Sequence, residues 1–519
     1  MQPPKSSRPH GGVRGANISR SSLLFGGPFG RIFRAVPPAD FGPNDDASLK
    51  NLDALAAQMV SLPADAPKDG PDNEESGIPA AYTYFGQFID HDLTFDPASS
   101  LQKQNDPDAL VDFRTPQFDL DNIYGRGPAD QPYMYNDDAR TFVLGSALTG
   151  APKPAKDLQR NGQTPARALI GDPRNDENVI VGQLQGLWHR FHNKIANGNT
   201  TWSFQRVQQH VRFHYQWVLI HDFLPTIVAK EVLDDVYQLD KAGTVVKPNV
   251  KFFHHRDFAF MPLEFSAAAY RFGHSMVRPG YRLNDAIKPL PIFAPGNDVD
   301  LRGFKAPQPT WAIDWRRFID LVPLDYGTLV DNPDQSDPKN QNRLQLAYKI
   351  DTSLVGQLGT LPIKVAGGGN PRSLAQLNLE RGWRMRLPSG QDIARAMELE
   401  PLHDADILIG KFTGDNKDIV GPINKMGDGT SFVENCPLWT YVLAETVEST
   451  VTVKTLEGDK AISTRKLGPV GGRIVAETFL GLLLADSSSY LSLNPLWQPT
   501  LKVNGVFGLR ELIQVALEG

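Results

Sequence analysis

A histidine flanked by two aspartates lies in a segment whose other residues are mainly apolar. The segment reads YFGQFIDHD over residues 84–92, with His91 between Asp90 and Asp92. If the segment is a helix, Gln87 lies four residues before His91 and shares its face. The apolar neighbours favour burial, which is costly for polar groups unless they have partners. The cluster is therefore a candidate reaction site, and the alternative is a cap cluster on a surface helix.

The second aspartate of this cluster faces away from the histidine and needs a partner of its own. Thr115, Asp119 and Asp121 lie at alternating positions in the segment TPQFDLD. In an extended loop their oxygens can converge, and the carbonyl of Gln117 could join them. Calcium takes about six to eight such oxygen ligands. The spacing suits either a calcium site that includes Asp92 or a solvated acidic turn.

Another histidine follows a glycine, shortly after residues 265–269, which are mostly small and apolar. His274 lies in YRFGHS, residues 270–275, and Gly273 removes side-chain bulk beside it. Such a surface would let a flat group approach, which makes His274 a candidate axial ligand of haem iron or, alternatively, a core histidine. An axial imidazole commonly donates its second N–H to a polar partner. Asn378, in LNLERG at residues 377–382, could accept that bond.

Two further groups of polar residues carry weaker signals. Arg174 and Glu177 lie in the loop GDPRNDE, residues 171–177, where charges are usually solvated. His210 and His214 are four residues apart, as two metal ligands on a helix would be. Their surroundings are apolar and aromatic, so we interpret them as packing residues and do not predict a metal hydrolase.

The elements that position these residues are expected to be helices. Hydrophobic periodicity predicts helices over 79–93, 178–197, 203–228, 265–277, 389–398 and 470–484. A small hairpin is expected near 451–458, and the loops 100–175 and 286–345 are long enough to wall a cofactor. The prediction is mainly α: one large helical domain over residues 76–519. Residues 1–75 are expected to form an N-terminal arm, partly extended or wrapped around the core, and its short apolar pieces 23–25 and 32–33 are expected to dock.

Composition excludes several classes of protein. A net charge of −6 gives no electrostatic case for nucleic-acid binding. The single cysteine, Cys436, excludes an intramolecular disulfide and a cysteine-based metal cluster within one chain. Membrane spans need about 18 uninterrupted apolar residues, and none occur. Residues 1–22 lack the apolar core of a secretory signal, so we expect a cytoplasmic protein or one exported by a leaderless route.

Together the quoted segments resemble the animal-type haem peroxidase family, within the peroxidase–cyclooxygenase superfamily. The resemblance covers roughly residues 78–390 and rests on the order of GQFIDHD, TPQFDLDNIYG, GDPRNDE, YRFGHS and LNLERG. The chain looks like a compact, bacterial-style member. The resemblance implies reduction of hydrogen peroxide and oxidation of halide, thiocyanate or small organic donors through an oxo-ferryl intermediate.

The resemblance also implies roles on the distal side of a haem b group. His91 would move the proton of the peroxide, Gln87 would hold water or halide, and Arg174 would stabilise charge as the O–O bond breaks. Asp90 and Glu177 occupy the positions that form ester bonds to haem methyl groups. Asn178 stands where myeloperoxidase has a methionine bonded to a haem vinyl. A sulfonium link is therefore not expected.

The resemblance also implies roles for residues on the proximal side of the haem and at a calcium site. His274 would be the proximal iron ligand, with Asn378 as its hydrogen-bond partner. A calcium ion would anchor the distal helix through Asp92, Thr115, Gln117 (carbonyl), Asp119 and Asp121. Because Asp92 is bonded to His91, losing the metal should misplace the base.

Two other functions fit the same resemblance less well. Fatty-acid dioxygenases of this superfamily need a radical-forming tyrosine three residues before the proximal histidine. Arg271 occupies that position, and Tyr270, one residue further, faces differently. A non-catalytic, calcium-stabilised interaction module would be expected to have lost distal residues, yet His91, Gln87 and Arg174 are all present.

Overall fold

The computed structural model describes residues 29–62, 64–94, 116–254, 259–294, 299–328, 336–362, 373–411 and 418–518. Helices dominate, as predicted, and the strands pair only in twos. The helices are α1 (Asp45–Met59), α2 (Ala81–Leu93), α3 (Asp121–Tyr124), α4 (Val179–Gly198), α5 (Phe204–Val218), α6 (Leu224–Ile227), α7 (Lys230–Val236), α8 (Leu263–Ser266), α9 (Pro338–Gln341), α10 (Leu374–Arg384), α11 (Gly390–Ala396), α12 (Leu438–Ala444), α13 (Pro469–Ala485), α14 (Tyr490–Leu493) and α15 (Leu509–Leu517).

The strands are short, apart from one hairpin. They are β1 (Phe29–Gly30), β2 (Glu75–Pro79), β3 (Leu144–Leu148), β4 (Ala155–Leu158), β5 (Gln238–Leu239), β6 (Val245–Val246), β7 (Met261–Pro262), β8 (Gly280–Tyr281), β9 (Leu290–Pro291), β10 (Leu346–Tyr348), β11 (Leu408–Gly410), β12 (Val420–Pro422), β13 (Val447–Thr455) and β14 (Gly458–Lys466). The predicted hairpin near 451–458 is real and longer than expected, because β13 and β14 pair along all of their length.

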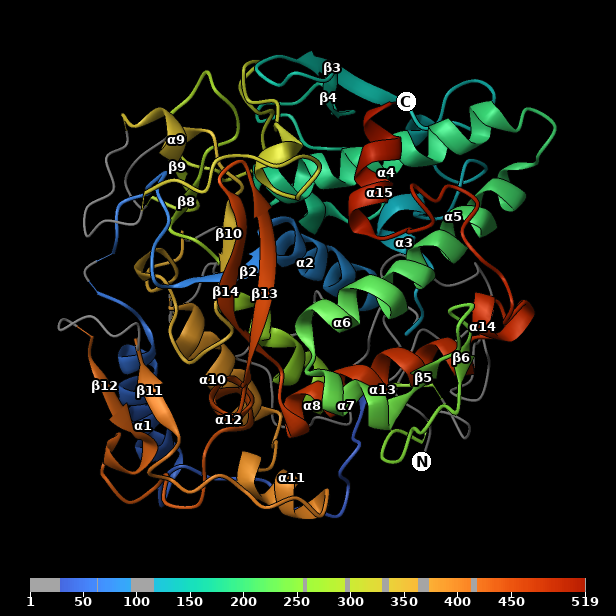
Figure 1. Ribbon diagram of the computed structural model, residues 1–519. Helices are drawn as coiled ribbons and strands as arrows, with labels where there is room; N and C mark the ends of the chain where they lie inside the picture. The colour runs from blue at the N-terminus through green and yellow to red at the C-terminus, as the bar shows by residue number, and fades with distance from the viewer. Residues whose placement is uncertain are drawn as a thin grey trace.

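Helix α2 runs through the middle of the molecule, below α4 in the view of Figure 1. Strand β2 leads directly into it and pairs antiparallel with β10. The hairpin β13–β14 presses on β2 at Gly77, where an added Cβ would lie 2.5 Å from Cβ of Val451. Gly77 also donates its N–H to Oγ1 of Thr464 at 2.7 Å. This close approach fixes the point from which α2 starts.

Helix α2 is buried on almost every face. Its half-buried residues are Gly86, Gln87 and Asp90, which share one face at helical spacing. The helix ends at Thr94, whose N–H and hydroxyl both donate to the carbonyl of Asp90, at 3.0 and 3.1 Å. The predicted helix over 79–93 is therefore confirmed, and its one open face carries polar side chains.

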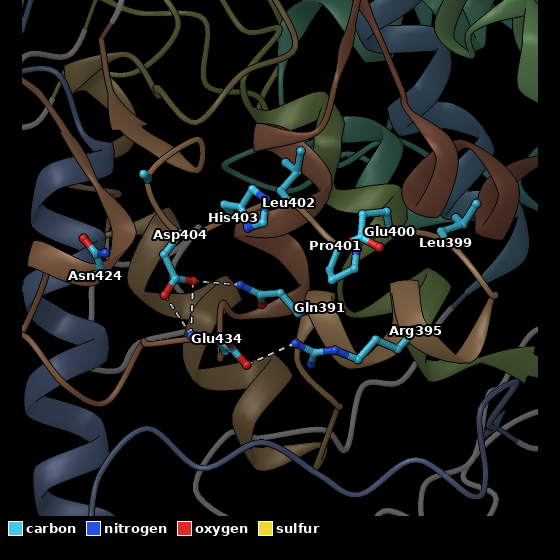
Figure 2. Close-up of a pocket in the computed structure, with 11 residues that line it drawn as sticks. Gln391, Arg395, Leu399, Glu400, Pro401, Leu402, His403, Asp404, Asn424 and Glu434 are labelled. Atoms are coloured by element: carbon cyan, nitrogen blue, oxygen red, sulfur yellow. Dashed lines mark hydrogen bonds and ion pairs between the residues drawn. The ribbon is translucent and has the colours of Figure 1, made fainter.

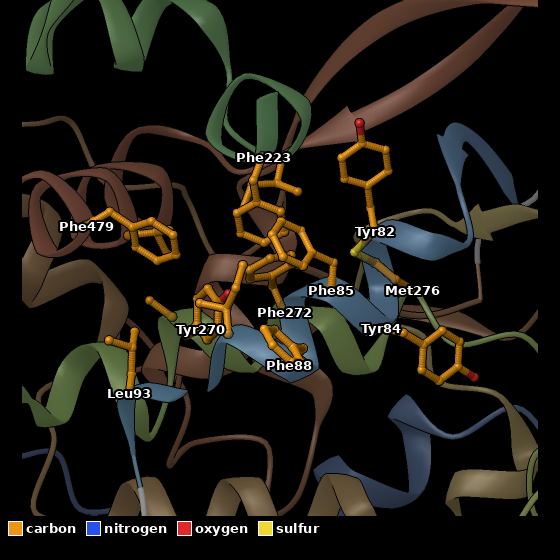
Figure 3. Close-up of a cluster of buried hydrophobic side chains, with 14 of the residues drawn as sticks. Tyr82, Tyr84, Phe85, Phe88, Leu93, Phe223, Tyr270, Phe272, Met276 and Phe479 are labelled. Carbon is orange, nitrogen blue, oxygen red and sulfur yellow. The ribbon is translucent and has the colours of Figure 1, made fainter. Parts of the chain in front are cut away.

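Aromatic side chains hold the opposite face of α2 (Figure 3). Phe88 stacks on Trp188 of α4, with ring centroids 5.4 Å apart and planes 6° from parallel. Phe85 meets Phe223 edge-on at 5.5 Å, and Tyr215 of α5 meets Trp188 in the same way. Such aromatic pairs add about 0.5–1.5 kcal/mol each beyond their buried area. They make α2 a rigid support for the polar residues on its other side.

Helix α4 begins where the side chain of Asn178 accepts the N–H groups of Ile180 and Val181, at 3.0 and 2.9 Å. Such a cap satisfies backbone donors that the first helical turn leaves free. The predicted apolar face is buried, as Leu184, Leu187, Phe191 and Ile195 show. The predicted helices over 178–197, 389–398 and 470–484 are confirmed as α4, α11 and α13.

The long helix predicted over 203–228 is interrupted. Its regular part, α5, ends at Val218, and a π-helical turn, Leu219–Phe223, leads into α6. Pro225 has no N–H, and its ring would clash with the carbonyl four residues earlier in a regular helix. The wider turn avoids that clash. It also directs Asp222 towards Tyr82 of α2, whose hydroxyl donates to it at 2.8 Å.

The single helix predicted over 265–277 is wrong. Helix α8 ends at Ser266, and a separate 3-10 turn, Ala269–His274, follows it. The carbonyl of Ser266 turns to accept Nε of Arg271 at 2.8 Å, and Ala268 has φ −137°, outside the helical region. In a 3-10 turn, residues three apart lie above one another. Arg271 therefore shares the side of His274.

The predicted N-terminal arm contains a helix, α1, that was not predicted although its apolar residues have helical spacing. The side chain of Asn44 caps α1 by accepting the N–H of Ala47 at 2.9 Å. Its buried residues, Leu52, Leu55, Ala56 and Met59, follow helical spacing and pack towards α10 and β11. The expected docking of 32–33 is confirmed, since both N–H groups donate to the Glu264 carboxylate. Residues 23–25, also expected to dock, lie outside the described residues, and the boundary at residue 75 stays a prediction.

Among the described residues, no helix combines the length and the apolar character that crossing a membrane requires.

Candidate active site

A cavity of about 600 Å³ lies between α2, the turn Ala269–His274 and α10. His91 and Gln87 line it from α2, His274 lines it from the turn, and Asn378 lines it from α10. The remaining lining is largely apolar and includes Leu263, Ile292, Phe293, Leu358, Leu361 and Leu374. The structure therefore brings the predicted distal and proximal residues to the walls of one cavity.

His91 is bound by a residue that was not predicted from the sequence. Its Nδ1 lies 2.7 Å from Oδ1 of Asn175, in the 3-10 turn Pro173–Asp176 that follows Asp172 and precedes α4. Burial, together with the positive charge of Arg174, lowers the pKa of His91 to about 4. The imidazole is therefore neutral at neutral pH, which is the state that a proton acceptor needs.

Gln87 belongs to a short chain of hydrogen bonds that starts at the beginning of α4. The side-chain oxygen of Asn178, Oδ1, caps the helix. Its side-chain nitrogen, Nδ2, is therefore turned away from the helix and donates to Oε1 of Gln87 at 3.2 Å. Nε2 of Gln87 then donates to the carboxylate of Glu177. Burial raises the pKa of Glu177 to about 7, although the charge of Arg174 opposes this shift. These hydrogen bonds orient the amide of Gln87, with Oε1 towards Asn178 and Nε2 towards Glu177.

Arg174 lies at the C-terminal end of α2. It donates to both carboxylate oxygens of Asp172, with Nη2 2.8 Å from Oδ2. The same nitrogen donates to the carbonyls of Thr94 and of His91, the latter at 3.2 Å. The carbonyl end of a helix attracts a cation. Asp172 and the end of α2 thus hold the guanidinium beside the backbone of His91.

On the other wall, the amide nitrogen of Asn378 lies 2.7 Å from Nδ1 of His274. The predicted partners are therefore in contact, but the amide presents its donor to the ring. The predicted acceptor role needs the amide oxygen there, which a half-turn about the last side-chain bond of Asn378 supplies. A Cβ added to Gly273 would meet no described atom within 4 Å, so open space lies beside His274.

Asp90 lies between the two walls. Its Oδ2 is 4.0 Å from Nη1 of Arg271, which comes from the proximal turn. Burial by itself would raise the pKa of Asp90, but the positive charges of Arg271 and Arg174 hold it below its usual value. Asp90 is therefore an ionised carboxylate at the cavity wall.

The residues predicted to bind calcium lie behind α2. Asp92 is fully buried, and its Oδ2 accepts the N–H of Leu120 at 3.2 Å. Oδ1 of Asp119 accepts the N–H of Asp121 at 3.1 Å, and Gln117 is half-buried in the same loop. Thr115 lies outside the described residues. Within those residues, no three acidic, histidine or cysteine side chains are grouped as metal ligands, and the calcium site stays a prediction.

A second cavity, of about 610 Å³, lies beside α11 (Figure 2). Three of its charged side chains have partners. Arg395 lies 3.2 Å from the carboxylate of Glu434, while Asp404 accepts Nε2 of Gln391 at 3.1 Å and the N–H of Glu434 at 2.9 Å. Because these groups bind one another and the backbone, the second cavity is a weaker candidate site than the first.

Three residues that contact His91 and Arg174, directly or through one another, were not predicted from the sequence: Asp172, Asn175 and Gln185. Gln185 lies in α4 and is fully buried, as are Asp172 and Asn175. The signal that could have revealed them is the presence of amides and acids in a segment that is otherwise apolar, because buried polar groups need partners.

Comparison with known proteins points to one family. The family model for animal haem peroxidase matches residues 100–302, which contain Arg174, Glu177 and His274. Over that range, which is less than half of the chain, the sequence is similar to this family. The segment with His91 lies just before the matched range.

Curated relatives match parts of the chain, and about a quarter of the aligned residues are identical. Peroxidasin of Drosophila melanogaster is 25% identical over 274 residues, which is 51% of this chain and 16% of that protein. Thyroid peroxidase of Rattus norvegicus is 24% identical over 214 residues, 37% of this chain and 21% of that protein. The chain therefore spans a small part of the length of these relatives.

Solved structures share the fold of this chain. Peroxidase A of Dictyostelium discoideum matches with a TM-score of 0.55 and 16% identity, over 90% of this chain and 89% of that one. Fatty acid alpha-dioxygenase of Arabidopsis thaliana matches with a TM-score of 0.51 and 15% identity, over 95% and 76%. Both likenesses support the helical haem-peroxidase fold.

The residues present fit the haem that this family implies. Two histidines line one cavity, and each has its Nδ1 edge turned to an asparagine, which leaves Nε2 at the opposite edge of the ring. The open space beside Gly273 gives a flat group access to His274. Pockets for small molecules commonly measure about 300–1,000 Å³, so a cavity of this size and apolar lining suits a porphyrin.

Proposed function

We propose that the protein is a peroxidase that uses haem b to reduce hydrogen peroxide. Reduction consumes two protons and two electrons for each peroxide and gives two water molecules. The electrons come from a halide, thiocyanate or a small organic donor. The observation that carries the proposal is the neutral, buried His91 on the wall of the cavity that His274 lines from the other side.

The chain's own residues supply the movement of the proton and the stabilisation of charge. Nε2 of His91 takes the proton from the peroxide and later gives it to the leaving oxygen. Arg174, anchored by Asp172, stabilises the negative charge that develops as the O–O bond breaks. Gln87, whose amide is oriented by Asn178, holds water or the halide.

His274, supported by Asn378, would ligate the haem iron, which supplies the site where peroxide binds and is reduced. Asp90 and Glu177 would tether the haem through esters to its methyl groups. Each ester would form at the expense of one methyl C–H bond and one proton. The proton would come from the carboxyl group where it is protonated and from solvent at the ionised Asp90, and one peroxide would take up both hydrogens to give two waters. Both carboxylates lie on the cavity wall, which supports this role.

Calcium would hold the loop 115–121 against the distal helix through Asp92. The bond from Leu120 to Asp92 supports this proposal, since it already joins that loop to α2. An anchor at Asp92 would set the position of the histidine next to it.

The experiment is haem titration followed by turnover. We expect a Soret band on addition of haem, and peroxide-dependent oxidation of at least one donor from a panel of bromide, iodide, thiocyanate and phenols. His91→Ala should keep the band and lose most of the reaction with peroxide, whereas His274→Ala should change the band. Wild-type reaction rates in His91→Ala would refute the assigned role.

A second candidate is oxygenation of fatty acids. Tyr270 lines the same cavity, and its hydroxyl donates to the carbonyl of Gly86 on α2 at 3.2 Å. The largely apolar lining would also accept an acyl chain. A tyrosyl radical together with oxygenation of linoleate, in the absence of a reducing donor, would favour this function over the peroxidase.

A further inference from the structure

A chain of buried hydrogen bonds leads from a backbone carbonyl in α3 to the distal histidine. Gln185 of α4 donates from Nε2 to the carbonyl of Asn122 at 3.2 Å, and its Oε1 accepts Nδ2 of Asn175 at 2.8 Å. Oδ1 of Asn175 lies 2.7 Å from Nδ1 of His91. Asn122, Asn175 and Gln185 are all fully buried, so water does not compete for these bonds.

The orientation of the first amide is fixed by its surroundings. The carbonyl of Asn122 can only accept, so Gln185 must present its amide nitrogen there. The same nitrogen lies 3.0 Å from Nε2 of His189, which can take its second hydrogen. The oxygen of Gln185 is thereby turned to Asn175 as an acceptor.

The second amide follows from the first. Because Gln185 offers an oxygen, Asn175 must present Nδ2 to it, which turns Oδ1 of Asn175 towards His91. An amide oxygen only accepts, so Nδ1 of His91 must carry the proton. The hydrogen bond that one ring nitrogen makes decides which of the two nitrogens carries the proton.

We propose that Asn175 and Gln185 are positioning residues that fix the tautomer of His91. They hold the proton on Nδ1 and leave the lone pair of Nε2 directed at the cavity. The other tautomer would set the lone pair of Nδ1 against the oxygen of Asn175, with no water to separate them. The consequence for catalysis rests on the proposed peroxidase function, in which Nε2 is the atom that takes the proton from peroxide.

The same helix offers a matched control. Gln183 is also a buried glutamine of α4 with both ends of its amide bonded to backbone, to the carbonyl of Trp311 at 2.7 Å and the N–H of Ile313 at 2.9 Å. It has no place in the chain that leads to His91. Gln183→Leu therefore reproduces the loss of a buried amide without disturbing the tautomer.

The direct test is ¹⁵N NMR of the whole chain labelled at histidine, measured with and without added haem. The sample with haem is kept ferrous and bound to carbon monoxide, because that form is diamagnetic. The His91 signals, assigned by their loss in His91→Gln, should show a protonated Nδ1 and an unprotonated Nε2. Asn175→Ala and Gln185→Leu should mix the tautomers. Asn175→Asp, which keeps an acceptor at Oδ1, and Gln183→Leu should not.

Stopped-flow reaction with peroxide gives the second readout. Proton transfer by a positioned side chain contributes about 10²–10⁴-fold, so Asn175→Ala should slow the reaction by about 10²-fold. Asn175→Asp should restore it to within about tenfold, and Gln183→Leu should match the wild type. If Asn175→Ala does not fold, the comparison of Gln185→Leu with Gln183→Leu carries the test.

A wild-type His91 protonated on Nε2, or unchanged tautomers in both Asn175→Ala and Gln185→Leu, would overturn the proposal. Equal slowing in Gln185→Leu and Gln183→Leu would also overturn it. A wild-type protein with the expected tautomer but no reaction with peroxide would reject the peroxidase function and still support the hydrogen-bond chain.

Discussion

Replacing Asp172 by asparagine should release the distal arginine. Asp172 is fully buried and binds Arg174 at three points: the backbone N–H at 2.8 Å, Nε at 3.1 Å and Nη2 at 2.8 Å. Asparagine keeps the size and one oxygen of this side chain, but it has no charge and turns an NH₂ group towards the guanidinium. Arg174 would then be held mainly by the carbonyls at the end of α2.

The expected magnitude follows from these contacts. A hydrogen bond to a charged group contributes about 1.5–3 kcal/mol. Because the Arg174 side chain is 26% exposed, water recovers part of that loss, and we expect unfolding to become easier by about 1–2 kcal/mol. The rate of the reaction with peroxide should fall by a larger factor, since a displacement of about 1 Å at a catalytic group can lower the rate by about 10²-fold.

A repeat of the same local arrangement elsewhere in the chain provides the control. Asp314 accepts the backbone N–H of Arg316 at 3.2 Å, its Nε at 2.9 Å and its Nη2 at 2.7 Å, again at the start of a 3-10 turn. Neither residue lines the cavity. Asp314 also lies 3.7 Å from Nε of the buried Arg317, so Asp314→Asn should lower stability by at least as much as Asp172→Asn. It should nevertheless leave the reaction with peroxide unchanged.

The assays are urea denaturation and stopped-flow mixing of the haem-loaded protein with peroxide. The reasoning fails if Asp172→Asn reacts at the wild-type rate. It also fails if Asp314→Asn slows the reaction as much as Asp172→Asn does, because the effect would then come from general destabilisation.

Three further predictions concern the same site. Phe88→Ala leaves a cavity against Trp188 and should lower the free energy of unfolding, measured by urea denaturation, by about 3–5 kcal/mol. A loss below about 1 kcal/mol would contradict the stabilisation of α2 by these aromatic side chains. Because burial raises the pKa of Glu177 to about 7, the folded state binds a proton more tightly than the unfolded chain. Stability should therefore fall as the pH rises from about 5 to about 7, and Glu177→Gln should flatten this part of the profile. Chelation of calcium should slow the reaction with peroxide by displacing His91 through Asp92, and adding calcium back should restore it; an unchanged rate in calcium-depleted protein would count against the metal site.

Much of the site could be predicted because its residues are close together in sequence. Asp90, His91 and Asp92 are adjacent, and helical periodicity alone puts Gln87 on the face of His91. The structure bears out the helix and the burial that the apolar neighbours implied. The roles of the residues came from the family resemblance rather than from the spacing.

The proximal segment shows where local patterns fail. Residues 265–277 have the composition of a helix, yet the chain breaks after Ser266 and continues as a 3-10 turn. The break depends on Arg271, whose side chain bonds back to the carbonyl of Ser266 while its charge lies near Asp90 of α2. That second contact joins residues far apart in the sequence, and helix propensity contains no information about it.

By itself, the sequence determined which residue types lie together on α2 and that this polar cluster must be buried and partnered. Periodicity and the free-energy cost of burying polar groups are local properties, so they can be read from neighbouring residues. Only the tertiary structure decided which partners they receive. The bond between His91 and Asn175 joins positions 84 residues apart, and its direction depends on Gln185 and on a backbone carbonyl of α3. Such a bond exists only once α2, α3 and α4 have packed, because its geometry comes from the placement of three elements rather than from any one of them.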